Sequence, residues 1–132
     1  MQISKLHILP TDNTPDIILD PEGIIKIKGR GMVLTNIGVS GQIMDWLDAY
    51  IGNPAEITYV SIAFEYLNSY CTTKLVSILK KISQVDLQNK KYLITWYHEE
   101  DDVDILERGE YISATLNIPI DFVMTYDIKT CC

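Results

Sequence analysis

A short polar stretch between two apolar segments carries most of the side chains in this sequence that could do chemistry. It reads Asn68-Ser69-Tyr70-Cys71-Thr72-Thr73-Lys74 and holds three aliphatic hydroxyls and a thiol. An alternating apolar segment precedes it and a segment with helical spacing follows it, so we expect it to join a strand to a helix. Functional groups of α/β folds commonly lie at the carboxyl ends of strands. We therefore take residues 68–74 as the candidate functional site.

The hydroxyls of this stretch are candidates for phosphorylation. A phosphoryl group adds a charge of about −1.5 to −2. The N-terminus of a helix favours such an anion through its N–H groups and its dipole. The alternative is structural: Thr72 or Thr73 caps the predicted helix and Ser69 satisfies a turn. The residues alone leave both alternatives open.

Cys71 is a candidate nucleophile, because helix N-termini activate thiols. However, no Arg follows it within the stretch and no glycine-rich cradle surrounds it. A small enzyme that uses Cys71 is therefore a minor alternative.

The other polar residues match no motif for a metal or cofactor. His7 and His98 fall in no metal-ligand spacing. The acidic run from Glu99 to Asp104 lacks the central Gly and the final Glu of a calcium loop, and acidic residues at a helix start are explained by the helix dipole. The glycines form neither GxGxxG nor GxxxxGK[ST]. We expect no metal and no cofactor.

Composition narrows the class of protein. The chain has 132 residues, the size of one domain, and a net charge of −7, which disfavours binding to nucleic acid or to an anionic membrane. Three cysteines, two of them adjacent, do not suggest a disulfide framework. No apolar run approaches the roughly 20 residues of a membrane span, and no export signal is visible. We expect a cytoplasmic protein with a single domain, residues 1–132.

Hydrophobic spacing predicts the elements that position the candidate site. A hairpin joins residues 17–19 to residues 25–28, and its turn is Asp20-Pro21-Glu22-Gly23. Further strands are expected at residues 57–66, 91–97 and 120–126, and helices at 40–51 and 75–85. A third helix is expected to open with the acidic run from Glu99 to Asp102 and to continue to Leu116. The alternation in the first of these strands should place Phe64 and Tyr66 on the same side. Strand, helix, strand, helix, strand favours parallel pairing. The predicted fold is α/β: a mixed β-sheet with an N-terminal hairpin and about three helices packed on it.

Several short pieces, in their order and spacing, resemble the SiaC-type regulatory phosphoproteins along nearly the whole chain. They are Leu6-His7-Ile8, Thr14-Pro15, Gly29, Gly41-Gln42, Asp45-Trp46, Tyr66-Leu67-Asn68-Ser69 with Lys74, and Trp96-Tyr97-His98 before the acidic run. Two departures stand out. The stretch between Asn68 and Lys74 is one residue longer than the family pattern, and Met32-Val33-Leu34-Thr35 replaces the family's aromatic-Pro-Glu-Asn stretch.

The resemblance implies a fold similar to the STAS-like anti-sigma-factor antagonists. It also implies partners: a Ser/Thr kinase of the histidine-kinase-like ATPase fold, a PP2C-type phosphatase, and an effector such as a diguanylate cyclase. The family's phosphorylated residue corresponds to Ser69 when counted from Asn68, and to Tyr70 when counted back from Lys74. Thr72 and Thr73 remain as alternatives.

We accordingly expect a phosphorylation-gated signalling adaptor, not an enzyme. Its phosphosite is Ser69, Thr72 or Thr73, and its partners bind around Asn68, Tyr70 and Lys74. A structural or interaction subunit without a phospho-switch is the alternative, ahead of the enzyme that uses Cys71.

Overall fold

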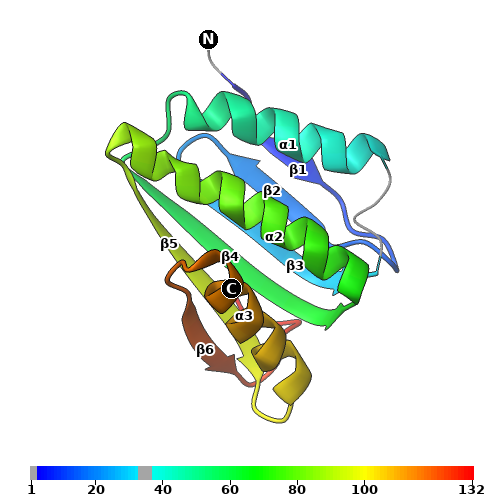
Figure 1. The fold of residues 1–132 in the computed structure, drawn as a ribbon. Helices are drawn as coiled ribbons and strands as arrows, with labels where there is room; N and C mark the ends of the chain where they lie inside the picture. The colour runs from blue at the N-terminus through cyan, green and yellow to red at the C-terminus, as the bar shows by residue number, and fades with distance from the viewer. Residues whose placement is uncertain (1–2, 33–36) are drawn as a thin grey trace.

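The computed structural model describes residues 3–32 and 37–132, and it leaves out the side chains of residues 37 and 38. One six-stranded sheet carries three α-helices on one of its faces (Figure 1). The strands are β1 (Leu6–Ile8), β2 (Asp16–Asp20), β3 (Ile24–Gly31), β4 (Ile57–Leu67), β5 (Lys91–Glu99) and β6 (Asp121–Thr125). The helices are α1 (Ile37–Ile51), α2 (Ser69–Ser83), the short 3₁₀ helix η1 (Gln84–Gln88) and α3 (Val103–Leu116).

The sheet is mixed, as the sequence predicts. Its strand order is β1-β2-β3-β4-β5-β6. The first three strands pair antiparallel, with Ile17 opposite Ile27 in the predicted hairpin. Strands β3 to β6 pair in parallel. The sequence prediction missed β1, because three residues are too few to show an alternating pattern.

The main core lies between the sheet and the helices. Along β4, Thr58, Val60, Ile62 and Phe64 alternate as predicted and all are buried. The prediction for Tyr66 is wrong: Tyr66 is exposed, and the neighbouring Leu67 is buried instead. The pairing explains the change, since Gly29 lies opposite Phe64 and Arg30 opposite Tyr66, which leaves an extra residue in β4. Such a bulge interrupts the two-residue period.

Aromatic side chains fix two of the helices on this sheet. The Trp46 and Tyr50 rings of α1 stack with their centroids 5.0 Å apart. The Tyr50 hydroxyl lies 2.7 Å from the Thr58 hydroxyl of β4, so both buried groups are hydrogen-bonded. Trp96 of β5 is fully buried and donates its indole N–H to the Ile105 carbonyl of α3 at 3.0 Å.

The segment that follows β6 crosses the sheet face opposite the helices (Figure 1). Its Ile128 is 2% exposed, and the Ile128 N–H donates to the Glu99 carboxylate at 2.9 Å. Lys28 of β3 donates to the Cys131 carbonyl at 2.7 Å. Burial, helped by the adjacent Cys132, raises the pKa of the Cys131 thiol to about 12. The segment is therefore docked by one apolar anchor and several polar contacts. No helix in the described part of the chain is long and apolar enough to cross a membrane.

The first prediction concerns Gly109, where α3 meets the sheet. A Cβ atom there would lie 2.7 Å from carbons of both Trp96 and Phe122. Gly109→Ala should lower the free energy of unfolding by about 1–3 kcal/mol in urea denaturation, because the buried Trp96 ring and the partly buried Phe122 ring must shift. Gly41→Ala is the matched control: its Cβ would meet nothing within 4 Å, so the helix should gain about 0.5–1 kcal/mol. Equal stability of the Gly109 variant and wild type would show that the packing is looser than described.

The second prediction concerns the anchor of the C-terminal segment. Ile128→Ala should lower the free energy of unfolding by about 2 kcal/mol, because it removes buried apolar surface and leaves a cavity. It should also speed hydrogen exchange at the residue 128 amide, whose bond to Glu99 depends on the docked segment. Lys129→Ala is the control, since an exposed ion pair such as Lys129–Glu65 contributes little. An unchanged exchange rate in the Ile128 variant would mean that the polar contacts alone hold the segment.

Candidate functional site

The candidate site lies where the parallel strands end. The carboxyl ends of β3 and β4 are neighbours, with Gly31 paired to Leu67. Asn68 follows Leu67 directly, and its side chain contacts both the end of β3 and the start of α2. Its side-chain Nδ2 donates to the Met32 carbonyl at 2.8 Å, and its Oδ1 accepts from the Cys71 N–H at 2.8 Å. Asn68 therefore links the end of β3 to the first turn of α2.

Helix α2 starts earlier than the sequence prediction placed it. Residues 69–73 are helical, and the N-cap is Asn68, not Thr72 or Thr73. Asn is as good an N-cap as Thr, and it comes first in the chain. The two threonine hydroxyls instead bond carbonyls one turn back, Thr72 to Asn68 at 2.8 Å and Thr73 to Ser69 at 3.1 Å. The predicted loop is thus the first turn of a helix.

The three hydroxyls differ in access. Ser69 is exposed and occupies the first position of α2. Thr72 is only 7% exposed, and its hydroxyl is engaged on both sides: it donates to Asn68 and accepts from Arg108 at 3.2 Å. Thr73 is exposed. A modifying enzyme can therefore reach Ser69 and Thr73, but not Thr72, without disturbing the helix.

The other residues of the predicted site separate into buried and exposed groups. Cys71 is fully buried in the core, so no substrate reaches its sulfur in this structure. Tyr70 is exposed, and the Lys74 ammonium lies 5.6 Å from the centre of its ring. Tyr70 and Lys74 are thus available to a partner, whereas the Asn68 side chain is already hydrogen-bonded to Met32 and Cys71.

A groove between α2 and α3 contains the accessible hydroxyls. Its α2 wall is formed by Ser69, Thr72 and Thr73. Its α3 wall is formed by Asp104, Glu107, Arg108 and Tyr111. Of the described residues that line the groove, Arg108 alone is a cation, and its Nε lies 3.3 Å from the Asp104 carboxylate.

The sequence prediction missed the α3 wall of this groove. Positions 104, 107, 108 and 111 have the three- and four-residue spacing of one helix face, which the sequence does show. The sequence does not show that this face lies beside α2. That placement follows from parallel pairing of β4 with β5, which brings consecutive helices to neighbouring positions on the sheet.

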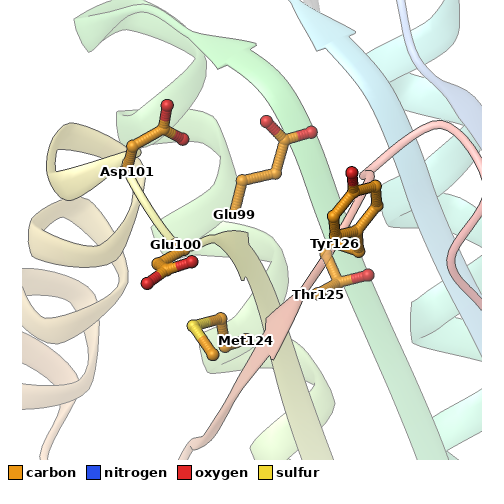
Figure 2. A pocket seen from close by; sticks show the side chains of 6 residues that line it. All are labelled: Glu99, Glu100, Asp101, Met124, Thr125 and Tyr126. Carbon is orange, nitrogen blue, oxygen red and sulfur yellow. The ribbon is translucent and has the colours of Figure 1, made fainter.

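The acidic run forms a second hollow at the same edge of the sheet (Figure 2). One side is formed by Glu99, at the end of β5, and by Glu100 and Asp101 of the turn that follows. The other side is formed by Met124 and Thr125, at the end of β6, and by Tyr126, which follows β6. As predicted, acidic residues stand at the start of α3: Asp102 caps it by accepting from the Ile105 N–H at 3.1 Å. Not all of these carboxylates face solvent. Glu99 is half-buried and bonds Ile128.

Neither histidine lies in a cluster of metal ligands. His7 Nε2 is 2.6 Å from the Asp16 carboxylate, and His98 Nδ1 is 3.1 Å from the Glu99 carbonyl. Within residues 3–32 and 37–132, no group of three or more His, Cys, Asp or Glu side chains is placed to hold a metal ion.

Known proteins are similar to this chain in sequence or in overall fold. An uncharacterised protein of Pseudomonas aeruginosa (strain UCBPP-PA14) is 20% identical over 118 residues, which cover 89% of this chain and 94% of the relative. A chain in the crystal structure of the diguanylate cyclase SiaD in complex with its activator SiaC, from P. aeruginosa, superposes with a TM-score of 0.81 at 19% identity, covering 91% of this chain and 99% of that one. Apo-SiaC of P. aeruginosa superposes with a TM-score of 0.78 at 21% identity, covering 91% and 98%.

These structural likenesses establish the fold, and a family model establishes the family. The model of the SiaC family regulatory phosphoproteins matches residues 8–125, from the end of β1 to the end of β6. The match includes the α2 first turn and the α3 wall of the groove. The chain belongs to the SiaC family of regulatory phosphoproteins.

Proposed function

We propose that this chain is a cytoplasmic, single-domain adaptor, residues 1–132, that binds an effector protein through the surface around the α2 first turn. Phosphorylation of Ser69 weakens that binding. The observation that carries the proposal is the position of Ser69, which is exposed at the first position of α2 and lines the groove between α2 and α3. A phosphate there sits at a helix N-terminus, where an anion is tolerated, so the protein can carry it without unfolding.

We further propose a diguanylate cyclase as the effector, because SiaC of P. aeruginosa is described as the activator of the cyclase SiaD. A Ser/Thr kinase and a PP2C-type phosphatase would add and remove the phosphate. In this proposal the chain itself catalyses no reaction. The burial of Cys71 supports this, since a nucleophilic thiol must be reachable by its substrate.

The proposed docking surface combines a switchable group with fixed contacts. Tyr70 follows Ser69 on the same helix, the Lys74 ammonium lies over the Tyr70 ring, and both side chains are accessible in part. A partner protein can contact the apolar area of the aromatic ring and the charge of the cation. The modifiable hydroxyl is the point where an added charge opposes docking. One modification can then act as a switch.

The third prediction identifies the modified residue. The chain is incubated with ATP and a candidate Ser/Thr kinase of the same organism, chosen from any such gene that lies beside its own, and phosphate is mapped by mass spectrometry. We expect phosphate on Ser69 and its loss in Ser69→Ala. Thr73→Ala is the matched control, because Thr73 is also exposed and lies one turn further along α2. Phosphate that survives Ser69→Ala and disappears in Thr73→Ala would move the switch to Thr73.

The fourth prediction concerns the effector. Ser69→Asp should weaken binding to the diguanylate cyclase of the same organism about tenfold or more, because it adds a charge to the docking surface. One carboxylate carries less charge than a phosphate, so this is a lower limit. Ser77→Asp places the same charge on an exposed position of α2 two turns away, and should change binding less than twofold. Equal binding by both variants would favour an interaction subunit without a phospho-switch.

A further inference from the structure

We propose that Arg108 receives the phosphate of modified Ser69, ties α3 to the first turn of α2 and thereby closes the groove between them. This inference rests on the proposed function and specifies how the same site is regulated. Arg108 belongs to α3, and it takes on this role only when Ser69 of α2 is phosphorylated.

The guanidinium of Arg108 is already held over the right turn of α2. Its Nη1 donates to the Thr72 hydroxyl at 3.2 Å. Thr72 is itself well held, because it is 7% exposed and its hydroxyl donates to the Asn68 carbonyl at 2.8 Å. The Arg108 head group is therefore fixed by α2 although it belongs to α3.

Ser69 lies close to Thr72 on the same helix. Residues three apart on a helix have Cβ atoms about 5–6 Å from each other. Ser69 is three residues before Thr72, and both line the groove that also contains Arg108. Side chains on a helix lean toward its N-terminus, so Thr72 leans toward the Ser69 turn. A phosphoryl group extends the Ser69 side chain by a further bond and brings its oxygens within reach of the guanidinium.

The present partners of Arg108 are weak competitors for it. The Asp104 carboxylate is 3.3 Å from Nε, but its side chain is 72% exposed, and exposed ion pairs on one helix contribute little. A phosphate dianion carries more charge and can accept two parallel N–H bonds from the guanidinium. Asp104 can release Arg108 at small cost, because it lies in the first turn of α3, where the helix dipole favours a negative charge.

The remaining charges of the groove make Arg108 necessary for this arrangement. Asp104 and Glu107 both line the groove and repel a phosphate. The N–H of Cys71 in the α2 first turn is already taken by Asn68. Without Arg108, the phosphate would face two carboxylates with no cation among the described lining residues. With Arg108, the phosphate bridges α2 and α3, so a partner loses both the Ser69 hydroxyl and the space beside it.

The test uses protein with phosphoserine installed at position 69 during translation, so no kinase is required. Phosphorus NMR follows the second ionisation of the phosphoserine as a function of pH. A neighbouring cation favours the dianion, so we expect the phosphoserine pKa to be lower in the wild-type background than in Arg108→Gln, by about half a unit or more. Arg108→Lys should fall between them, since it keeps the charge and loses the two-pronged geometry.

Lys74→Gln is the matched control. Lys74 is the other cation near this turn, but it lies over the Tyr70 ring and does not line the groove. It should shift the phosphoserine pKa less than Arg108→Gln does. Urea denaturation of each variant confirms that folded proteins are compared, and Arg108→Lys carries the test alone if Arg108→Gln does not fold.

The possible outcomes separate this inference from the proposed function. An identical phosphoserine pKa in wild type and in the Arg108 variants overturns the inference, even if the kinase modifies Ser69. A larger effect from Lys74→Gln than from Arg108→Gln also overturns it, and would assign the phosphate to Lys74. A clear Arg108 effect supports the inference even where the kinase leaves Ser69 unmodified, an outcome that would instead count against the proposed function.

Discussion

The hydrogen bonds of Asn68 hold the candidate site together. Its backbone N–H donates to Gly31 and its side-chain amide to Met32, which fixes it to the end of β3. Its two oxygens accept from the N–H groups of Cys71 and Thr72 and from the Thr72 hydroxyl, which fixes the first turn of α2. The position of Ser69, the next residue, is a consequence of these bonds.

This constraint extends to the groove. Because Thr72 is held by Asn68, its hydroxyl presents a fixed acceptor to Arg108, and α3 is connected to α2 through one polar contact. The exposed hydroxyl of Ser69 then lines the same groove as a cation that Thr72 already holds. A charge added at Ser69 can therefore redirect one hydrogen-bonded side chain without disturbing the core.

Family membership and structural detail contribute different kinds of information. The family match spans residues 8–125 and brings the general role of a regulatory phosphoprotein. Identity to the compared proteins is near 20%, so individual contacts have to come from this chain. The segment after residue 125 illustrates this: it lies beyond the family match, yet its Ile128 is buried and its N–H is bonded to Glu99.

The two faces of the sheet are covered by different means. The helices cover one face with a continuous apolar core, which tolerates little change in volume around Trp96 and Gly109. The last residues of the chain cover part of the other face with a single apolar anchor and polar bonds from Lys28 and to Glu99. The helix-covered face is part of the cooperative folding unit, whereas the C-terminal segment can detach from its face by local unfolding.

The sequence by itself determined the class of fold, most of its elements and the location of the candidate site. Long periodic segments identified the hairpin, the helices and the parallel strands, because burial of one face imposes a period that local residues must obey. It placed Ser69 next to a strand end, and the order and spacing of short motifs pointed to the family.

The sequence prediction failed where several local solutions compete: Asn68, Thr72 and Thr73 are all competent caps, and only the contact of Asn68 with Met32 selects among them. It failed also at Tyr66, where a bulge shifts the period, and at β1, which is too short to show one. Only the tertiary structure placed Arg108 in the same groove as Ser69, because residues on different helices come together through the packing of both helices on one sheet, which no local pattern in the sequence records.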